Sequence, residues 1–181
     1  MKYVYTYESP LGTMVMAGTR SSLTNLDFKG QLYMPDFGAD YTRKDTALFK
    51  RVAAWLDEYF LGKKPEPNIP LSLEGTEFRK DVWKILQNIP YGSTTTYGMI
   101  AKEIAKERGQ NMSAQAVGGA VGHNPVSIIV PCHRVIGSDG SLTGYAGGKD
   151  KKRFLLDLEG ASYLKQGVKI YRLLEITELM F

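Results

Sequence analysis

Apolar and polar residues alternate along the first thirty positions of the chain, as they do in half-buried β-strands. The alternation predicts three short strands, over residues 3–8, 13–18 and 23–28, separated by turns rich in Pro, Gly and Ser. Over residues 45–60, apolar residues recur at intervals of three and four, which is the spacing of an amphipathic helix. The first part of the chain therefore predicts a small sheet followed by one helix.

Residues 62–70 contain three prolines and cannot continue that helix. We place a domain boundary after them and predict an N-terminal domain over residues 1–72 and a second domain over residues 73–165. Residues 166–181 form a tail, in which residues 170–176 fit either a strand or a helix.

The sequence of the second domain predicts mainly helices. Thr76 is placed to cap a helix with one apolar face, which consists of Phe78, Val82, Ile85, Leu86 and Ile89, and the turn Pro90-Tyr91-Gly92 ends it. A second helix follows Ser93-Thr94-Thr95-Thr96, with Ile100, Ala101, Ile104 and Ala105 facing inward. A last helix over residues 149–158 turns Phe154, Leu155 and Leu158 inward and is capped by Gly160.

A third helix, over residues 114–121, is capped by Ser113 and follows the second after a short connection that contains glycine. Two short helices joined in this way are typical of a helix-turn-helix. Gly118 and Gly119 lie inside the third helix, where each glycine costs about 1 kcal/mol relative to alanine. They predict a close approach, either by a neighbouring helix or by a nucleic-acid backbone.

Charge and composition narrow the class of protein. The net charge is +4, and residues 75–160 carry eleven Lys and Arg against eight Asp and Glu, a surplus that suits a nucleic acid but also an ordinary surface. No apolar stretch approaches the ~20 residues that cross a bilayer, and the N-terminus lacks a secretory pattern. One cysteine forms no internal disulfide, so we expect a cytoplasmic protein without a membrane association. One cysteine and two histidines also fall short of a structural zinc set, so we expect no metal and no cofactor.

That single cysteine is the candidate nucleophile. Cys132 follows Pro131 and precedes His133 and Arg134, between an apolar run and a glycine-rich loop. An isolated cysteine is most often a small buried hydrophobe. An adjacent imidazole and guanidinium, however, can lower the pKa of a thiol and so favour the reactive thiolate. We therefore interpret Cys132 as a nucleophile.

Several blocks of the second domain, in order and at matching spacing, resemble the O6-alkylguanine-DNA alkyltransferase family. The blocks are Pro90-Tyr91-Gly92, Thr96-Tyr97-Gly98, Ala116-Val117-Gly118-Gly119-Ala120, Asn124-Pro125, Pro131-Cys132-His133-Arg134-Val135, Gly144-Tyr145-Ala146-Gly147-Gly148 and Leu158-Glu159-Gly160. The resemblance covers residues 76–160; before them the chain resembles the family only in its order of strands and helix. It implies an α+β protein, with a small α/β N-terminal domain of the ribonuclease H-like type. The mostly helical C-terminal domain would contain a winged-helix or helix-turn-helix variant.

The resemblance also implies the catalytic residues. Cys132 would accept the alkyl group irreversibly, His133 would take the thiol proton, and Glu159 would orient His133. Tyr97 matches a tyrosine that donates to the base ring, which suits a phenol next to an anionic leaving group. Asn124 matches an asparagine that ties the cysteine turn together, because an amide can donate and accept at once.

The alkylated base has to leave the duplex stack and enter a pocket. The resemblance implies that this pocket is formed by Val121, Val126, Val135 and the loop of residues 143–148. In that loop, Tyr145 would contact the flipped nucleobase, and the backbone amide of Ala146 would face the alkylated oxygen. The third helix would enter the minor groove with Gln115, Ala116, Gly118 and Gly119. Arg134 completes the predicted DNA contacts.

The chain departs from the family at two positions. Gln115 stands where many members have an intercalating arginine, so it supplies no cation for base flipping. Ser127 stands where some members have a second proline that walls the pocket, which predicts a weaker grip on bulky alkyl groups.

The first hypothesis is therefore a single-turnover DNA-repair alkyltransferase that moves an alkyl group from O6-alkylguanine in double-stranded DNA to Cys132. O4-alkylthymine is a second candidate substrate, and we expect the protein to be a monomer. A module that only recognises alkylated bases would lack the cysteine. A cysteine hydrolase or redox enzyme would not explain the helix-turn-helix, and no second cysteine is present to resolve a disulfide.

Overall fold

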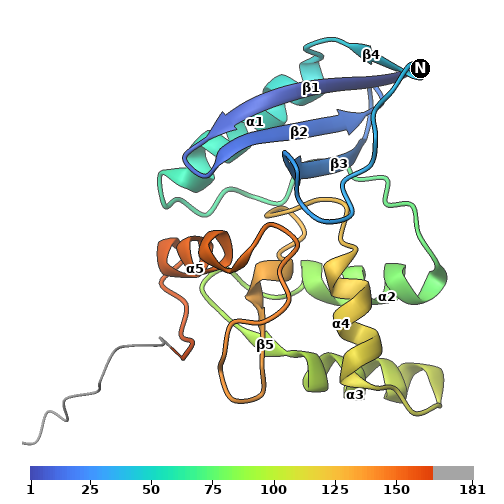
Figure 1. The fold of residues 1–181 in the computed structure, drawn as a ribbon, viewed down its shortest axis with the longest axis vertical. Helices are drawn as coiled ribbons and strands as arrows, with labels where there is room; N and C mark the ends of the chain where they lie inside the picture. Colours follow the sequence, from blue (N-terminus) through green and yellow to red (C-terminus); the bar gives the residue numbers. More distant parts are fainter. Residues whose placement is uncertain (165–181) are drawn as a thin grey trace, which may run out of the picture.

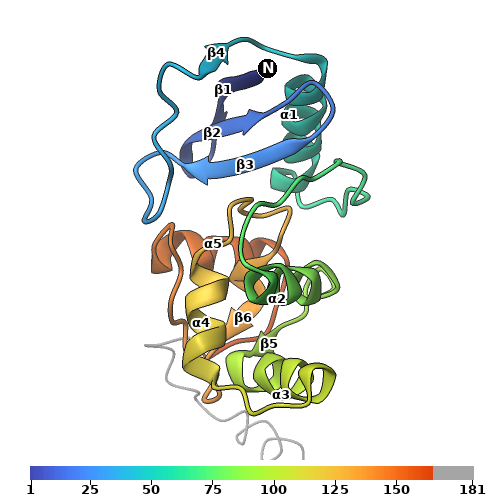
Figure 2. The same ribbon diagram turned by 90° about the vertical axis from the view of Figure 1, so that its right-hand side faces the viewer.

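The structure is a computed structural model that describes residues 1–164. It consists of two lobes, an N-terminal sheet with one helix and a C-terminal group of helices (Figures 1 and 2). Among the described residues, no helix has the length and apolar character needed to cross a membrane. The suggested strand or helix over residues 170–176 lies outside this range.

The N-terminal sheet has the strand order β3-β2-β1-β4. Strands β1 (Lys2–Ser9), β2 (Gly12–Gly18) and β3 (Leu23–Phe28) are antiparallel neighbours and confirm the three predicted strands. The short edge strand β4 (Tyr41–Arg43) pairs in parallel with β1 and was not predicted. Three residues give too short an alternation to stand out in a sequence.

Helix α1 (Ala47–Phe60) packs against β1. It begins two residues later than predicted because Thr46 caps it, with its hydroxyl accepting from the backbone N–H of Phe49. The residues of β1 that face α1 include Tyr7, whose hydroxyl donates to Asp57 of the helix at 2.7 Å. This face of the sheet therefore forms the N-terminal part of the core.

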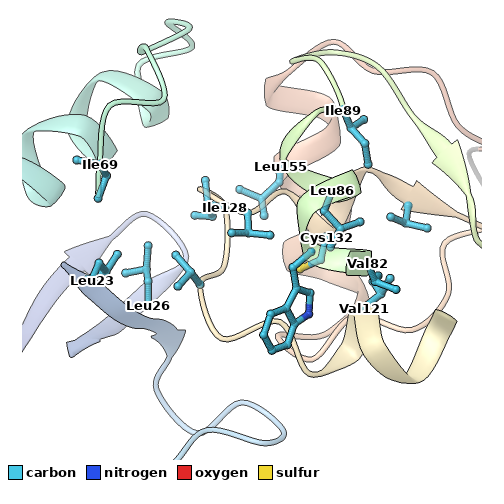
Figure 3. Packing of buried hydrophobic residues seen from close by; sticks show 14 of the residues in the cluster. Leu23, Leu26, Ile69, Val82, Leu86, Ile89, Val121, Ile128, Cys132 and Leu155 are labelled. Atoms are coloured by element: carbon cyan, nitrogen blue, oxygen red, sulfur yellow. The ribbon is translucent and has the colours of Figure 1, made fainter. Parts of the chain in front are cut away.

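The two lobes share one hydrophobic cluster. The proline-rich segment returns to the sheet, where Leu23 donates to the carbonyl of Pro70 at 2.9 Å and accepts from the N–H of Ser72 at 2.9 Å. In Figure 3, Leu23, Leu26 and Ile69 form one group and Leu86 and Cys132 belong to another, with Ile128 between them. The N-terminal domain therefore packs directly against the region of the cysteine.

The C-terminal domain contains helices α2 (Glu77–Gln87), α3 (Tyr97–Arg108), α4 (Ala114–Gly122) and α5 (Lys149–Leu158). The predicted caps Thr76 and Ser113 are confirmed, because the hydroxyl of each accepts from the backbone N–H three residues later. Two short strands, β5 (Thr95–Thr96) and β6 (Val135–Ile136), pair in parallel. This pair places the start of α3 beside the residues that follow Cys132.

The predicted inward face of α5 is wrong at one position. Phe154 is 39% exposed, whereas Lys152 is fully buried together with Leu155 and Leu156. A lysine can lie inside when its ammonium finds acceptors, and Lys152 donates to the carbonyls of Val135 at 2.5 Å and Thr143 at 2.7 Å. The helix ends as expected, with Gly160 at φ +67° after the cap residue Glu159.

Candidate active site

Cys132 begins a single 3-10 turn, Cys132–Arg134, at the end of a tight loop. The loop places Ile128 at φ +70°, a left-handed conformation that is costly for a β-branched residue. Only 7% of Cys132 is exposed. The Nδ2 atom of Asn124 donates to the carbonyl of Val130 at 2.7 Å and to the sulfur of Cys132 at 3.1 Å. The asparagine thus ties the loop to the thiol.

The surroundings act on the pKa of the thiol in opposite directions. Burial raises the pKa of Cys132, while the hydrogen bond from Asn124 and the positive charge of Lys152 lower it. The burial effect is larger, so the resting site holds a thiol and needs a base to form the thiolate.

His133 is the adjacent candidate for that base, and Glu159 is hydrogen-bonded to it. The Nε2 atom of His133 lies 2.7 Å from Oε1 of Glu159, and both side chains are fully buried. Nε2 therefore carries the proton that the carboxylate accepts, which leaves Nδ1 to accept another. Nδ1 is buried and has no partner among the described residues. Burial lowers the pKa of His133 and Glu159 opposes it, so the resting imidazole is neutral.

Arg134, which was predicted to contact DNA, is buried beside Glu159. Its guanidinium points into the protein, where Nε donates to Oε2 of Glu159 at 2.8 Å, Nη2 to Oε1 at 3.0 Å and Nη1 to the carbonyl of Ile89 at 2.6 Å. A side chain that is 11% exposed and bound in this way is not free to bind a phosphate. Arg134 instead holds the Glu159 carboxylate with two hydrogen bonds.

The Glu159 carboxylate accepts hydrogen bonds from four residues of the site. Besides His133 and Arg134, it accepts from the N–H of Gly92 at 3.1 Å and from the hydroxyl of Tyr59 at 2.6 Å. Burial raises the pKa of Glu159, but hydrogen bonds from His133 and Arg134 outweigh it and hold the pKa below its usual range. Gly92 has φ +77°, and a Cβ there would lie 2.9 Å from the carbonyl oxygen of Glu159, so only glycine suits this contact.

Two contributors to the site were missed by sequence reasoning. Tyr59 falls within the helix predicted over residues 45–60 and Lys152 within the one predicted over residues 149–158, and the sequence singled out neither as a site residue. Lys152 is the nearby cation that acts on Cys132, and burial lowers its own pKa to about 8. The helical periodicity of α5 was the available signal, because Lys152 precedes the buried Leu155 and Leu156 by three and four positions.

Tyr97 and the loop of residues 143–148 lie together. The hydroxyl of Tyr97 donates to the carbonyl of Thr143 at 2.9 Å, the same carbonyl that accepts from Lys152. The carbonyl of Ala146 accepts from the N–H of Leu32 in the N-terminal domain at 3.3 Å. The hydroxyl of Tyr145 is buried without a hydrogen-bond partner in the described part of the chain. Tyr97 and the loop form hydrogen bonds within the protein, so their contacts with a nucleobase stay predictions.

The three valines predicted to line the pocket are buried in the core and do not line a pocket at the surface. Val121, Val126 and Val135 are each at most 2% exposed and belong to the same core cluster as Cys132. They therefore form part of the apolar surroundings of the thiol. Ser127 is 3% exposed, with its hydroxyl 3.5 Å from Oε1 of Gln31.

The outer face of helix α4 is exposed and consists of Gln115, Ala116 and Gly119. A Cβ at Gly118 would lie 3.8 Å from the ring of Tyr97, an ordinary packing distance, whereas a Cβ at Gly119 would meet nothing within 4 Å. Packing within the protein therefore gives no reason for glycine at 119. Helix α4 contacts α3, from which residues 109–113 separate it.

The described residues contain no cluster of three or more His, Cys, Asp or Glu that could hold a metal ion.

The sequence matches two family models, one for each lobe. Residues 2–73 match the ribonuclease-like domain of 6-O-methylguanine DNA methyltransferase, and residues 77–161 match its DNA-binding domain. The chain belongs to the methylated-DNA–protein-cysteine methyltransferase family. The fold class implied by the sequence resemblance is thereby confirmed, including the N-terminal domain, where the sequence alone offered only a pattern of elements.

Relatives in this methyltransferase family match along nearly their whole length. The methylated-DNA–protein-cysteine methyltransferase of Mycobacterium tuberculosis is 46% identical, and the match covers 88% of this chain and 93% of the relative. That of Methanosarcina acetivorans is 44% identical, covering 88% and 99%. The crystal structure of M. tuberculosis OGT in complex with DNA superposes with a TM-score of 0.78 at 46% identity, covering 87% of this chain and 92% of that one.

Proposed function

We propose that this protein repairs DNA by transferring a methyl group from O6-methylguanine in double-stranded DNA to Cys132. The observation that carries the proposal is the connected set of side chains at the cysteine: a buried thiol held by Asn124, and a neutral His133 bound to a buried Glu159 carboxylate. Membership of the methylated-DNA–protein-cysteine methyltransferase family supports this reaction.

In the proposed reaction the thiol proton of Cys132 moves to Nδ1 of His133, directly or through a water molecule. The thiolate then attacks the methyl carbon, the sulfur–carbon bond forms and the carbon–oxygen bond breaks, with its electron pair going to the guanine. Glu159 stabilises the imidazolium meanwhile. The guanine anion finally takes up one proton, which balances the proton that His133 took from the thiol and returns the imidazole to its neutral form. The thioether is inert, so each molecule reacts once. No cofactor takes part in these steps.

The outer face of α4 is the proposed DNA contact. Gln115, Ala116 and Gly119 are exposed there, and the space above Gly119 would allow a nucleic-acid backbone to come close. Tyr97 would exchange its bond to the Thr143 carbonyl for one to the flipped base. We propose a monomer that acts in the cytoplasm, and leave O4-alkylthymine as a second substrate to the test below.

The test is incubation with a duplex that carries one O6-methylguanine, followed by intact-mass measurement and peptide mapping, with Cys132→Ala as the control. We expect one methyl group on Cys132, saturating at one equivalent and absent from the control. Lesion binding without methylation would refute transfer and favour a module that only recognises the lesion. A duplex with O4-methylthymine, run in parallel, ranks the two substrates.

A further inference from the structure

The N-terminal domain reaches into the catalytic network through one side chain. Tyr59 lies near the end of α1, is 1% exposed, and directs its hydroxyl at Oε1 of Glu159 at 2.6 Å. The same oxygen accepts from Nε2 of His133 at 2.7 Å. Nη2 of Arg134 donates to this oxygen as well, at 3.0 Å. Three donors thus meet on one carboxylate oxygen, and Tyr59 is the one that comes from the N-terminal domain.

The ring of Tyr59 is fixed by its neighbours. It stacks on Trp55 with 5.6 Å between the ring centroids and meets the edges of Phe60 and Tyr91 at 5.5 and 6.0 Å. Burial, and next the adjacent Glu159 carboxylate, raise the pKa of Tyr59 well above its ordinary value. The hydroxyl therefore keeps its proton and acts as a fixed donor to Glu159.

We propose that Tyr59 is a positioning residue of the methyl-transfer site that acts through Glu159: its hydroxyl competes with His133 for Oε1 and limits how strongly the carboxylate draws a proton onto His133. The inference rests on the proposed function, because it assigns Tyr59 to the proton transfer that activates Cys132. It goes beyond that function, since it makes a residue of the N-terminal domain part of the active site.

The direction of the effect follows from the geometry. An oxygen that already accepts a short hydrogen bond has less charge to offer a second donor, so Tyr59 weakens the hold of Glu159 on an imidazolium. The hydroxyl oxygen also lies 3.4 Å from Nε2 of His133, where it could stabilise the imidazolium directly. That contact is much longer than the 2.6 Å bond to Glu159, so competition is the stronger effect.

Other charged and titratable groups around Glu159 stay in place when the hydroxyl is removed. They are Arg134 from the cysteine turn, Tyr91 from the turn after α2, and Lys152 and Tyr145 from α5 and the loop before it. Arg134 matters most, because its two bonds hold both carboxylate oxygens. Glu159 therefore keeps its orientation in a Tyr59→Phe variant, and only the competition is lost.

The test is the pH dependence of Cys132 alkylation by iodoacetamide, measured by intact mass in the full-length protein without DNA. Tyr59→Phe is expected to lower the pH at half-maximal rate, with a reaction about three- to tenfold faster on the acidic side, which is about the net effect of one hydrogen bond of ordinary strength. Tyr91→Phe is the matched control. Its hydroxyl lies in the same cluster but donates to the carbonyls of Leu158 and Gly62, so the midpoint should not move.

An unchanged or higher midpoint in Tyr59→Phe would overturn the inference, as would an equal shift in Tyr91→Phe. If Tyr59→Phe does not fold, difluorotyrosine at position 59 replaces it. This stronger donor should raise the midpoint, and a lowered or unmoved midpoint would contradict the proposal. Because iodoacetamide needs no DNA, these results are independent of the methyl-transfer measurement, so failure of the proposed function would be recognised separately.

Discussion

Asp27 should make the stability of the protein fall as the pH rises, and replacing it with Asn should remove this effect. Asp27 lies in β3, is 2% exposed, and accepts hydrogen bonds only from the neutral side chains of Gln31 at 2.6 Å and Asn25 at 3.3 Å. Within residues 1–164, no Lys or Arg forms an ion pair with it. Burial consequently raises the pKa of Asp27 from 3.8 to about 7, and the bond from Asn25 opposes it only in part.

The sign follows from proton binding. Between the two pKa values the folded protein keeps a proton on Asp27 that the unfolded chain has lost, so the free energy of unfolding decreases as the pH rises. At 1.36 kcal/mol per pH unit, the full displacement amounts to about 4 kcal/mol, of which about 2.5 kcal/mol is lost between about pH 5 and about pH 8. An amide cannot ionise, so Asp27→Asn carries no such loss.

The assay is urea unfolding at several pH values, followed by the fluorescence of Trp55 and Trp83. The difference in unfolding free energy, variant minus wild type, should rise by about 2.5 kcal/mol over that range. A constant offset from the altered hydrogen bond to Asn25 does not affect this slope. Asp150→Asn, whose side chain is 98% exposed, controls for the loss of a negative charge. Parallel pH profiles for wild type and Asp27→Asn would refute the reasoning.

Three further substitutions test the site. Gly119→Ala should stabilise the fold by about 0.5–1 kcal/mol, because its Cβ meets nothing within 4 Å in the protein, and it should weaken duplex binding. Urea unfolding measures the change in stability, and a titration with duplex DNA measures the change in binding. Unimpaired binding would exclude a close contact between DNA and residue 119. Gln115→Arg should tighten duplex binding and steepen its salt dependence by about one phosphate equivalent, measured by titration at several salt concentrations; an unaltered slope would count against an α4 contact. Lys152→Met removes the cation that lowers the pKa of Cys132, so iodoacetamide alkylation near neutral pH should slow about tenfold and its midpoint should rise. Equal rates would show that Lys152 acts only on the loop through Val135 and Thr143.

Elements with a strong local signal could be predicted from the sequence. Three strands, the five α-helices within residues 1–164 and the caps Thr76 and Ser113 follow from periodicity and side-chain hydrogen bonding within a few residues. The strands β4, β5 and β6 were missed, because each has two or three residues and exists only through its partner strand. Phe154 was wrongly predicted to face inward, and Lys152 is buried because the carbonyls of Val135 and Thr143 accept from its ammonium.

The sequence by itself determined the class of chemistry and singled out the candidate nucleophile and its candidate base. Cys132 and His133 are neighbours, so their proximity is fixed by the chain, and the ordered motif blocks identify the family. The tertiary structure decided how the base is held. Glu159 and Arg134 are 25 residues apart, and Tyr59 is 100 residues from Glu159, so no local pattern indicates that they meet. It also turned Arg134 inward, toward Glu159, since a buried carboxylate requires donors and the fold supplied them from both domains.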